Sequence, residues 1–181
     1  MPSLPTLIVV SGPAGSGKTT LAHAIAAAVG CPAICRDEIK EGMVHAGRGG
    51  PAPFVPGTGD ELTVRTFPVF FGVLEMLLRA GVTTVAEAAF QDHVWRPRLE
   101  PLVDGARLRI VHCTVDADVA RRRIVERAAD NPLRRAHADA QAVAPHAFNR
   151  IRLDAPSLEV DTTSGYRPGL DQIVAFINGS R

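Results

Sequence analysis

The glycine-rich stretch SGPAGSGKTT, residues 11–20, constrains the fold of this chain more than any other part of its sequence. It lies between the continuous apolar run Leu7–Val10 and the segment Lys18–Val29, in which apolar residues recur at helical spacing. The stretch fits the pattern G-x-x-x-x-G-K-[ST], in which glycines let successive backbone N–H groups point inward at a phosphate. The following helix would turn its positive end toward the same place. A phosphate-binding loop is therefore predicted, and the alternative is a glycine-rich turn without a ligand.

The residue types in this loop have separate tasks. Lys18 is expected to reach the β- and γ-phosphates of a nucleotide, and the Thr19 hydroxyl is expected to hold Mg²⁺. Lys18 is one of only two lysines in a chain with 20 basic residues, and an arginine cannot easily replace a compact ammonium in such a loop. The predicted nucleotide-binding residues are Gly12, Pro13, Ala14, Gly15, Ser16, Gly17, Lys18, Thr19 and Thr20, together with Arg123 from a later helix.

Strand-like and helix-like segments alternate along the chain. The expected strands are Leu7–Val10, Ala33–Cys35, Val82–Ala86, Leu108–Thr114 and Leu158–Val160. The expected helices are Lys18–Val29, Asp37–His45, Glu61–Ala80, Trp95–Val103, Asp116–Ala129 and Leu170–Ile177. Pro68 is expected to kink one helix or mark its start, and prolines are expected to interrupt the helix over 95–103. The alternation predicts an α/β/α fold with a parallel sheet, which binds ligands beyond the carboxyl ends of its strands.

Length and composition favour one domain over residues 1–181. The formal net charge of +1 gives no overall basic field that would attract nucleic acid or a membrane surface. No apolar stretch reaches the ~18 residues of a membrane span, and no signal peptide is recognisable, so a cytoplasmic location is expected. The glycine- and proline-rich residues 43–60 are expected to form a flexible substrate flap, and the arginine-rich residues 121–145 a lid.

Two classes of nucleotide-binding protein are disfavoured by missing motifs. A GTPase would need an N-K-x-D stretch to bind guanine, and neither that stretch nor D-x-x-G occurs. A mechanical ATPase would normally need a second subdomain, for which the chain is short. A compact phosphotransferase, or a nucleotide binder without transfer activity, remains.

Asp37 is the candidate catalytic base because it directly follows the second expected strand. That strand is expected to neighbour the first, which would place Asp37 across from the γ-phosphate. Phosphoryl transfer to a hydroxyl needs a carboxylate that takes the hydroxyl proton. Asp37 could instead cap the helix that follows it, although position 40 is Lys and the reciprocal capping box is missing. The two roles are compatible, and both stay open at this point.

Glu87 ends the third expected strand and is the second candidate carboxylate. An acidic residue there could orient the Mg²⁺ shell together with Thr19, or it could be a solvated carboxylate at the end of a strand. Asp92 follows closely and competes for the same role.

Arg123 and Arg127 lie one helical turn apart and on the same helix face. With Arg134 and Arg135 they form a basic cluster that could fold over the nucleotide and neutralise charge on the transferred group. A segment that closes in this way would also exclude water. The alternative is an ordinary exposed and charged helix face.

The histidines and cysteines show no metal-binding pattern. None of the six histidines pairs with another at metal-binding spacing, and Cys31 and Cys35 have no second Cys/His pair. We therefore expect small buried cysteines and structural roles for His23 and His112.

The acceptor pocket is expected to be built from residues 43–60, 61–80 and 90–98. Phe90 and Trp95 could line such a cleft, but packing in the core is the favoured interpretation for both.

Taken together, these motifs resemble those of the small P-loop kinases, in particular the chloramphenicol phosphotransferase-like and zeta-toxin-like group of AAA-type ATP-binding kinases. The telling matches, besides the loop, are Asp37-x-x-x-Glu41-Gly-Met and Val160-Asp161-Thr162-Thr163. The resemblance implies a five-stranded sheet in the order 2-3-1-4-5, ATP with Mg²⁺, an acidic base at Asp37 and lid arginines at Arg123 and Arg127. It also implies that the loop after Asp161 lies near the adenine.

The sequence thus predicts an ATP-dependent kinase that transfers the γ-phosphoryl group to a hydroxyl of a small molecule, either a metabolite or an antibiotic. A polynucleotide 5′-hydroxyl kinase is one alternative, but it would need a basic groove that tracks phosphates. A nucleotide-binding module without transfer activity is the other. The expected partners are ATP and a hydroxylated substrate, without membrane or nucleic acid, in a monomer or a homodimer.

Overall fold

The computed structural model describes residues 4–47, 59–130 and 148–179. Within these ranges the strands are β1 (Thr6–Ser11), β2 (Ala33–Cys35), β3 (Thr84–Glu87), β4 (Arg107–Thr114) and β5 (Ser157–Asp161). The helices are α1 (Lys18–Val29), α2 (Arg36–Gly47), α3 (Gly59–Arg79), α4 (Asp92–Val103), α5 (Ala117–Asp130) and α6 (Leu170–Asn178). No helix in these ranges has both the length and the apolar character needed to cross a membrane.

The strands form one parallel sheet in the order β2-β3-β1-β4-β5, which confirms the predicted fold. The central strand β1 is buried along its whole length, as its continuous apolar run predicts. In the register of the sheet, Val10 pairs with Glu87, and Glu87 pairs with Cys35. The carboxyl ends of β1, β2 and β3 therefore meet at one edge.

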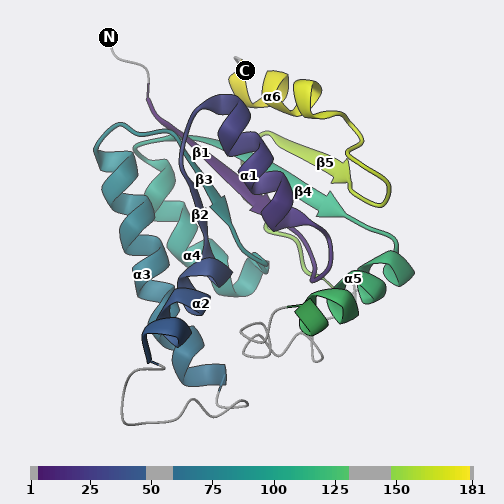
Figure 1. Ribbon diagram of the computed structural model, residues 1–181. Helices are drawn as coiled ribbons and strands as arrows, with labels where there is room; N and C mark the ends of the chain where they lie inside the picture. The colour runs from purple at the N-terminus through teal and green to yellow at the C-terminus, as the bar shows by residue number, and fades with distance from the viewer. Residues whose placement is uncertain (1–3, 48–58, 131–147, 180–181) are drawn as a thin grey trace.

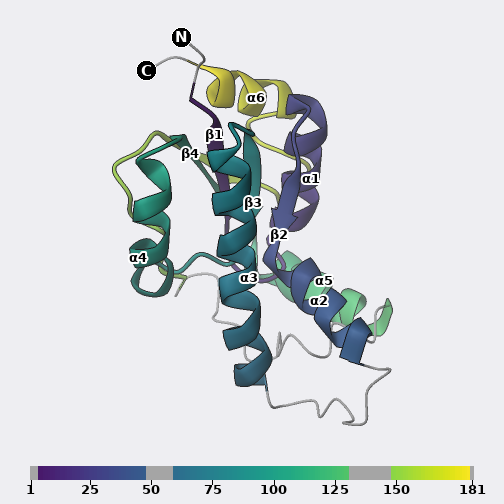
Figure 2. The same ribbon diagram turned by 90° about the vertical axis from the view of Figure 1, so that its left-hand side faces the viewer.

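Helices cover both faces of the sheet, as the alternation of strands and helices predicts. Leu7 and Val9 of β1 point into a core shared with α3 and α4, whereas Ile8 and Val10 point into a core shared with α1 and α6. Figure 1 shows α1 and α6 in front of the sheet, and Figure 2 shows the sheet between the two helical layers.

Phe90 and Trp95 belong to the core between the sheet and α3/α4. Phe90 is fully buried and Trp95 is 6% exposed, and their ring centroids lie 4.7 Å apart. Phe70 joins them, with its ring centroid 5.8 Å from that of Trp95. The core interpretation of these two residues is confirmed.

Part of the predicted flap over residues 43–60 is helical, so that expectation is wrong at both ends. Helix α2 continues to Gly47, because Val44 is buried and holds its last turn against the protein. Helix α3 begins at Gly59, and residues 48–58 lie outside the described residues. The predicted lid over 121–145 is helical up to Asp130, and residues 131–147 also lie outside the described part.

Proline does not interrupt the two helices in which it occurs. Pro68 lies inside α3 rather than at its start, and Pro97 and Pro101 lie inside a continuous α4. Each proline removes one backbone hydrogen bond, but burial of Trp95 and Leu99 holds α4 against the core. Tertiary packing therefore outweighs the local cost.

Candidate active site

The loop between β1 and α1 has the backbone that an anion-binding loop requires. Gly15 and Gly17 have φ values of 74° and 71°, in the left-handed region that favours glycine. Gly17 precedes α1 without a side-chain cap, and the first turn of the helix contains no acidic residue. Lys18 opens the helix and is 8% exposed. No acidic residue of its own first turn compensates the positive end of α1, which suits a phosphate.

The loop is also pressed closely against its neighbours. A Cβ atom on Gly15 would lie 2.5 Å from the backbone oxygen of Ala120 in α5, and one on Gly12 would lie 2.8 Å from that of Cys113 in β4. Glycine is therefore required at both positions by space, and at Gly15 by backbone conformation as well. Of the other predicted loop residues, Pro13 and Ser16 are buried, Ala14, Gly17 and Thr19 are half-buried, and Thr20 is exposed.

We expect Gly15→Ala to destabilise the protein by about 2–4 kcal/mol, because a strained φ and a backbone clash act together. Urea unfolding of the nucleotide-free protein measures this change. The matched control is Gly30→Ala, since Gly30 has a φ of 77° but nothing within 4 Å of an added Cβ. Equal losses in the two variants would show that the close approach to α5 has no energetic consequence.

Two side chains tie the loop to the segment after β5. The Thr162 hydroxyl donates a hydrogen bond to the backbone oxygen of Ser16 at 2.6 Å. The guanidinium of Arg123 donates to the backbone oxygen of Gly15 at 3.3 Å and to that of Thr162 at 2.8 Å. The predicted lid residue Arg123 therefore joins the loop to the segment after β5 by hydrogen bonds. Arg127 lies one turn farther along α5 and is half-buried.

Replacement of Arg123 by alanine is expected to weaken ATP binding about tenfold, because the charge-assisted hydrogen bonds that join Gly15 of the loop to Thr162 are lost. Lysine should not restore affinity, since a single ammonium cannot span the same carbonyl groups as a guanidinium. Titration with ATP measures the effect. Arg121→Ala is the control, because Arg121 is exposed and pairs with Asp118; a loss of affinity as large in this variant would refute the assignment to Arg123.

Glu87 contacts the two loop residues that matter most for phosphate and metal binding. Its Oε1 atom lies 3.8 Å from Nζ of Lys18, and its Oε2 atom accepts a hydrogen bond of 3.2 Å from the Thr19 hydroxyl. The side chain is 1% exposed. It is therefore not a solvated strand-end carboxylate, as one interpretation of the sequence had it.

Burial raises the pKa of Glu87, and the charge of Asp37 raises it further, whereas Lys18 opposes the shift. Among the described residues, Oε1 of Glu87 accepts no hydrogen bond. A buried carboxylate oxygen with no donor, next to a threonine hydroxyl, is a donor set that fits Mg²⁺. Glu87 and Thr19 are thus the residues that could hold this ion.

Asp37 lies within the first turn of α2, whose first residue is Arg36. It does not precede the helix as a capping residue would, although a carboxylate in the first turn still interacts favourably with the helix dipole. Its Oδ1 atom accepts a hydrogen bond of 3.1 Å from Arg36, and its side chain is 28% exposed. Its charge acts on Glu87 across the ends of β2 and β3, so the two predicted carboxylates share one edge.

Asp92 binds Arg96 and Arg152 rather than the phosphate-binding loop. It accepts hydrogen bonds from the Arg96 side chain and from the backbone N–H of Arg152, and the bond from Arg96 lowers its pKa. Of the two acidic residues that competed for the metal, Glu87 is the one that contacts the loop.

A cavity of about 330 Å³ adjoins the start of the loop, and sequence reasoning did not predict it. It is lined by Gly12 and Pro13 together with His112, Phe148, Arg150 and residues at the start of α5. Burial, followed by the charge of Arg150, lowers the pKa of His112. The only sequence signal for this cavity is a polar residue in each of two otherwise apolar strands, Ser11 in β1 and His112 in β4, which pair in the sheet.

Comparisons with known proteins identify a family and a set of similar folds. A family model described as an AAA domain matches residues 7–152. None of the curated proteins compared with the chain matches it in sequence.

Several solved structures are similar to the whole chain, among them the following three. A candidate kinase from Chloroflexus aurantiacus has a TM-score of 0.80 at 21% identity, over 97% of each chain. An APS kinase from Mycobacterium tuberculosis, solved with AMPPNP and APS, has a TM-score of 0.65 at 14% identity, over 99% of this chain and 100% of that one. A shikimate kinase from Acinetobacter baumannii, solved with shikimate, has a TM-score of 0.58 at 18% identity, over 97% and 94% of the two chains.

Proposed function

The chain belongs to the AAA domain family and has the fold of the P-loop kinases, and on that basis we propose that it is an ATP-dependent kinase. The γ-phosphoryl group of ATP passes to a hydroxyl group of a small molecule, such as a metabolite or an antibiotic. The observation that carries this proposal is the placement of Asp37 beside Glu87 where Glu87 contacts Lys18 and Thr19. A loop that only binds nucleotide has no need of a second carboxylate at its phosphate end, whereas proton removal from an acceptor does.

Each residue has a defined role in the proposed reaction. The loop amides and Lys18 hold the phosphates of ATP, and Asp37 takes the proton of the acceptor hydroxyl. Thr19 and Glu87 hold Mg²⁺, which neutralises charge on the phosphate oxygens when it is bound. Arg123 fixes the loop, and Arg127 extends the basic face of α5 toward the transferred group.

We place the acceptor hydroxyl at the phosphate end of the loop, next to Asp37, because that carboxylate must take its proton. The residues that line the cavity beside Gly12 and Pro13 include neither Asp37 nor Glu87, so this cavity does not hold the reacting hydroxyl. Of the acceptor pocket expected from residues 43–60, 61–80 and 90–98, Phe90 and Trp95 pack in the core instead.

A closer relationship to the chloramphenicol phosphotransferase-like and zeta-toxin-like kinases is also part of the proposal. It is supported by Asp37-x-x-x-Glu41-Gly-Met and by Val160-Asp161-Thr162-Thr163. The second motif has a physical purpose in this chain, since Thr162 holds the phosphate-binding loop.

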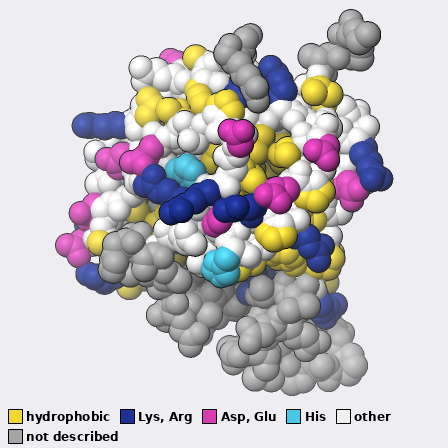
Figure 3. Space-filling view, turned by 180° about the vertical axis from the view of Figure 1, so that it is seen from behind, with side chains coloured by type: hydrophobic (Ala, Val, Ile, Leu, Met, Phe, Trp, Pro, Cys, Tyr) yellow, Lys and Arg dark blue, Asp and Glu magenta, His cyan; other side chains and the backbone are white. Residues whose placement is uncertain are grey.

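A nucleic-acid acceptor is less well supported than a small molecule. On the one face that Figure 3 shows, basic and acidic side chains of the described residues are interspersed, and no extended basic groove crosses that face. A polynucleotide substrate would need such a groove.

Transfer of labelled phosphate from ATP to a panel of hydroxylated metabolites, antibiotics and oligonucleotides tests the proposal. We expect labelling of a small hydroxylated compound that depends on Mg²⁺ and disappears in Lys18→Ala. Labelling of oligonucleotides alone, with affinity that falls steeply as salt is added, would replace the small-molecule acceptor by a polynucleotide. Binding of ATP without labelling of any compound would refute the transferase and leave a nucleotide-binding module.

A further inference from the structure

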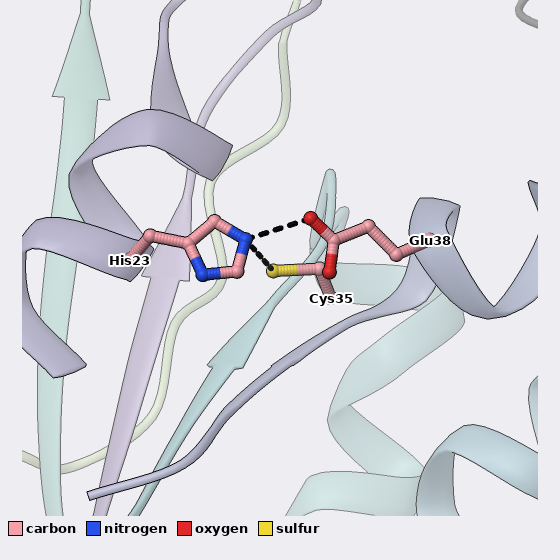
Figure 4. Close-up of side chains that lie close together, drawn as sticks. All are labelled: His23, Cys35 and Glu38. Carbon is pink, nitrogen blue, oxygen red and sulfur yellow. Dashed lines mark hydrogen bonds and ion pairs between the residues drawn. The ribbon is translucent and has the colours of Figure 1, made fainter. Parts of the chain in front are cut away.

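Three side chains from different elements converge beside the edge of the sheet that holds Asp37 and Glu87. His23 comes from α1, Cys35 ends β2, and Glu38 lies in the first turn of α2. Nε2 of His23 lies 2.7 Å from Oε1 of Glu38 and 3.7 Å from Sγ of Cys35. The three atoms all lie within 4.8 Å of one another, and Figure 4 shows one ring nitrogen facing both the sulfur and the carboxylate.

We propose that His23, Cys35 and Glu38 bind one Zn²⁺ or a chemically similar divalent cation. Imidazole nitrogen, thiolate sulfur and carboxylate oxygen are the three donor types that Zn²⁺ prefers. Tetrahedral Zn²⁺, with bonds of about 2.0–2.3 Å, holds its donor atoms roughly 3.3–3.6 Å apart. The donors of this cluster need only small movements to reach that geometry, and a fourth position stays open to water.

The burial of the cluster suits such an ion. Cys35 is 2% exposed and fixed at the end of a strand, so it supplies a rigid donor. The His23 and Glu38 side chains are 51% and 47% exposed, so they can adjust, and the ion can enter from solvent. On binding, the Cys35 thiol passes its proton to the buffer, and the contact between His23 and Glu38 gives way to two bonds to the metal.

This site uses donors other than those of the proposed Mg²⁺ site, Thr19 and Glu87, and it adjoins that site because Cys35 pairs with Glu87 in the sheet. Mg²⁺ prefers oxygen donors, whereas a thiol and an imidazole select a softer cation. The bound ion would join α1, β2 and α2, which carry Lys18 and Asp37. It would therefore hold together the two segments that build the phosphate end of the active site, whether or not the chain transfers phosphate.

The sequence did not reveal this cluster, because its three side chains do not follow one another at metal-binding spacing. His23 and Cys35 are 12 residues apart, and Glu38 is 15 residues from His23. The short, regular spacings of zinc motifs are missing because the ligands are assembled by the packing of α1 on the sheet. Cys31 is half-buried rather than buried and lies outside the cluster.

Titration of the metal-free, full-length protein with Co²⁺ and then with Zn²⁺ tests the proposal. One equivalent of Co²⁺ should produce a thiolate-to-cobalt absorption band that Zn²⁺ displaces. The melting temperature should rise by about 5–10 °C at a Zn²⁺ concentration one hundred times Kd. Because removal of a ligand weakens metal binding, His23→Ala, Glu38→Gln and Cys35→Ser should each lower the affinity at least about tenfold.

Two matched variants serve as controls, and neither residue belongs to the cluster. Cys31→Ser removes a thiol four residues away, and His45→Ala removes an exposed imidazole from α2; both should bind Zn²⁺ as the unsubstituted protein does. His23→Ala and Glu38→Gln change exposed side chains, so they test the site even if Cys35→Ser folds poorly. Absence of the cobalt band, or unchanged affinity in His23→Ala and Glu38→Gln, would overturn the proposal.

Discussion

Replacement of Asp37 by asparagine is expected to lower kcat for phosphoryl transfer about 10²–10⁴-fold, the usual contribution of a general base. The affinity for ATP should change little, because the phosphates are held by the loop amides and Lys18 rather than by Asp37. Asparagine keeps the size of the side chain but cannot take a proton from the acceptor hydroxyl. Steady-state transfer assays and direct ATP titration separate the two effects.

A matched control distinguishes this chemical role from an effect on helix stability. Asp37 lies in the first turn of α2, and Asp171 lies in the first turn of α6, away from the phosphate-binding loop. Both carboxylates interact with a helix dipole, so Asp37→Asn and Asp171→Asn should have similar small effects on the melting temperature. Only Asp37→Asn should lose turnover, and unchanged turnover in that variant would remove Asp37 as the base.

The parts of the site that could be predicted from the sequence are those that local patterns determine. Gly12 to Thr19 form one continuous motif, and the apolar run before it and the helical spacing after it define both flanking elements. The order of the strands followed from the family resemblance. The rule that parallel strands end at one edge brought Asp37 and Glu87 together, but the second strand does not neighbour the first as expected, since β3 lies between them.

The parts that could not be predicted depend on contacts between distant segments. The hold of Arg123 on the backbone of Gly15 joins residues 108 positions apart, and nothing in the sequence of α5 specifies it. The same is true of His112, whose cavity needs residues from the start of α5 and from 148–150. The expectation that prolines would interrupt α3 and α4 failed for a related reason. Proline disfavours a helix locally, but the packing of the helix against the core, which the sequence does not specify, outweighs that effect.

Glu87→Gln is expected to change activity and stability in opposite directions. Transfer should fall about 10²–10³-fold, because a neutral amide is a poorer partner for Mg²⁺ and for Lys18. Stability should gain instead, since a carboxylate buried at 1% exposure is charged only at a cost. Transfer assays and thermal unfolding of the nucleotide-free protein, without added metal, measure the two changes.

The pH dependence of the melting temperature supplies the sharper test, because two carboxylates of this chain are shifted in opposite directions. Burial raises the pKa of Glu87 in the folded protein. The stability that the protonated Glu87 side chain contributes is therefore lost as pH rises from the ordinary pKa of a carboxyl group through the raised pKa. The advantage of Glu87→Gln over the unsubstituted protein should therefore grow with pH across that window. The hydrogen bond from Arg96 lowers the pKa of Asp92 in the folded protein. Ionised Asp92 therefore stabilises the fold above the ordinary pKa of a carboxyl group, and this stabilisation is lost as pH falls through the lowered pKa. The melting temperature of Asp92→Asn should thus fall further below that of the unsubstituted protein as pH rises. If the melting temperatures of both variants changed in the same direction with pH relative to the unsubstituted protein, the buried charge of Glu87 would not destabilise the folded protein as proposed.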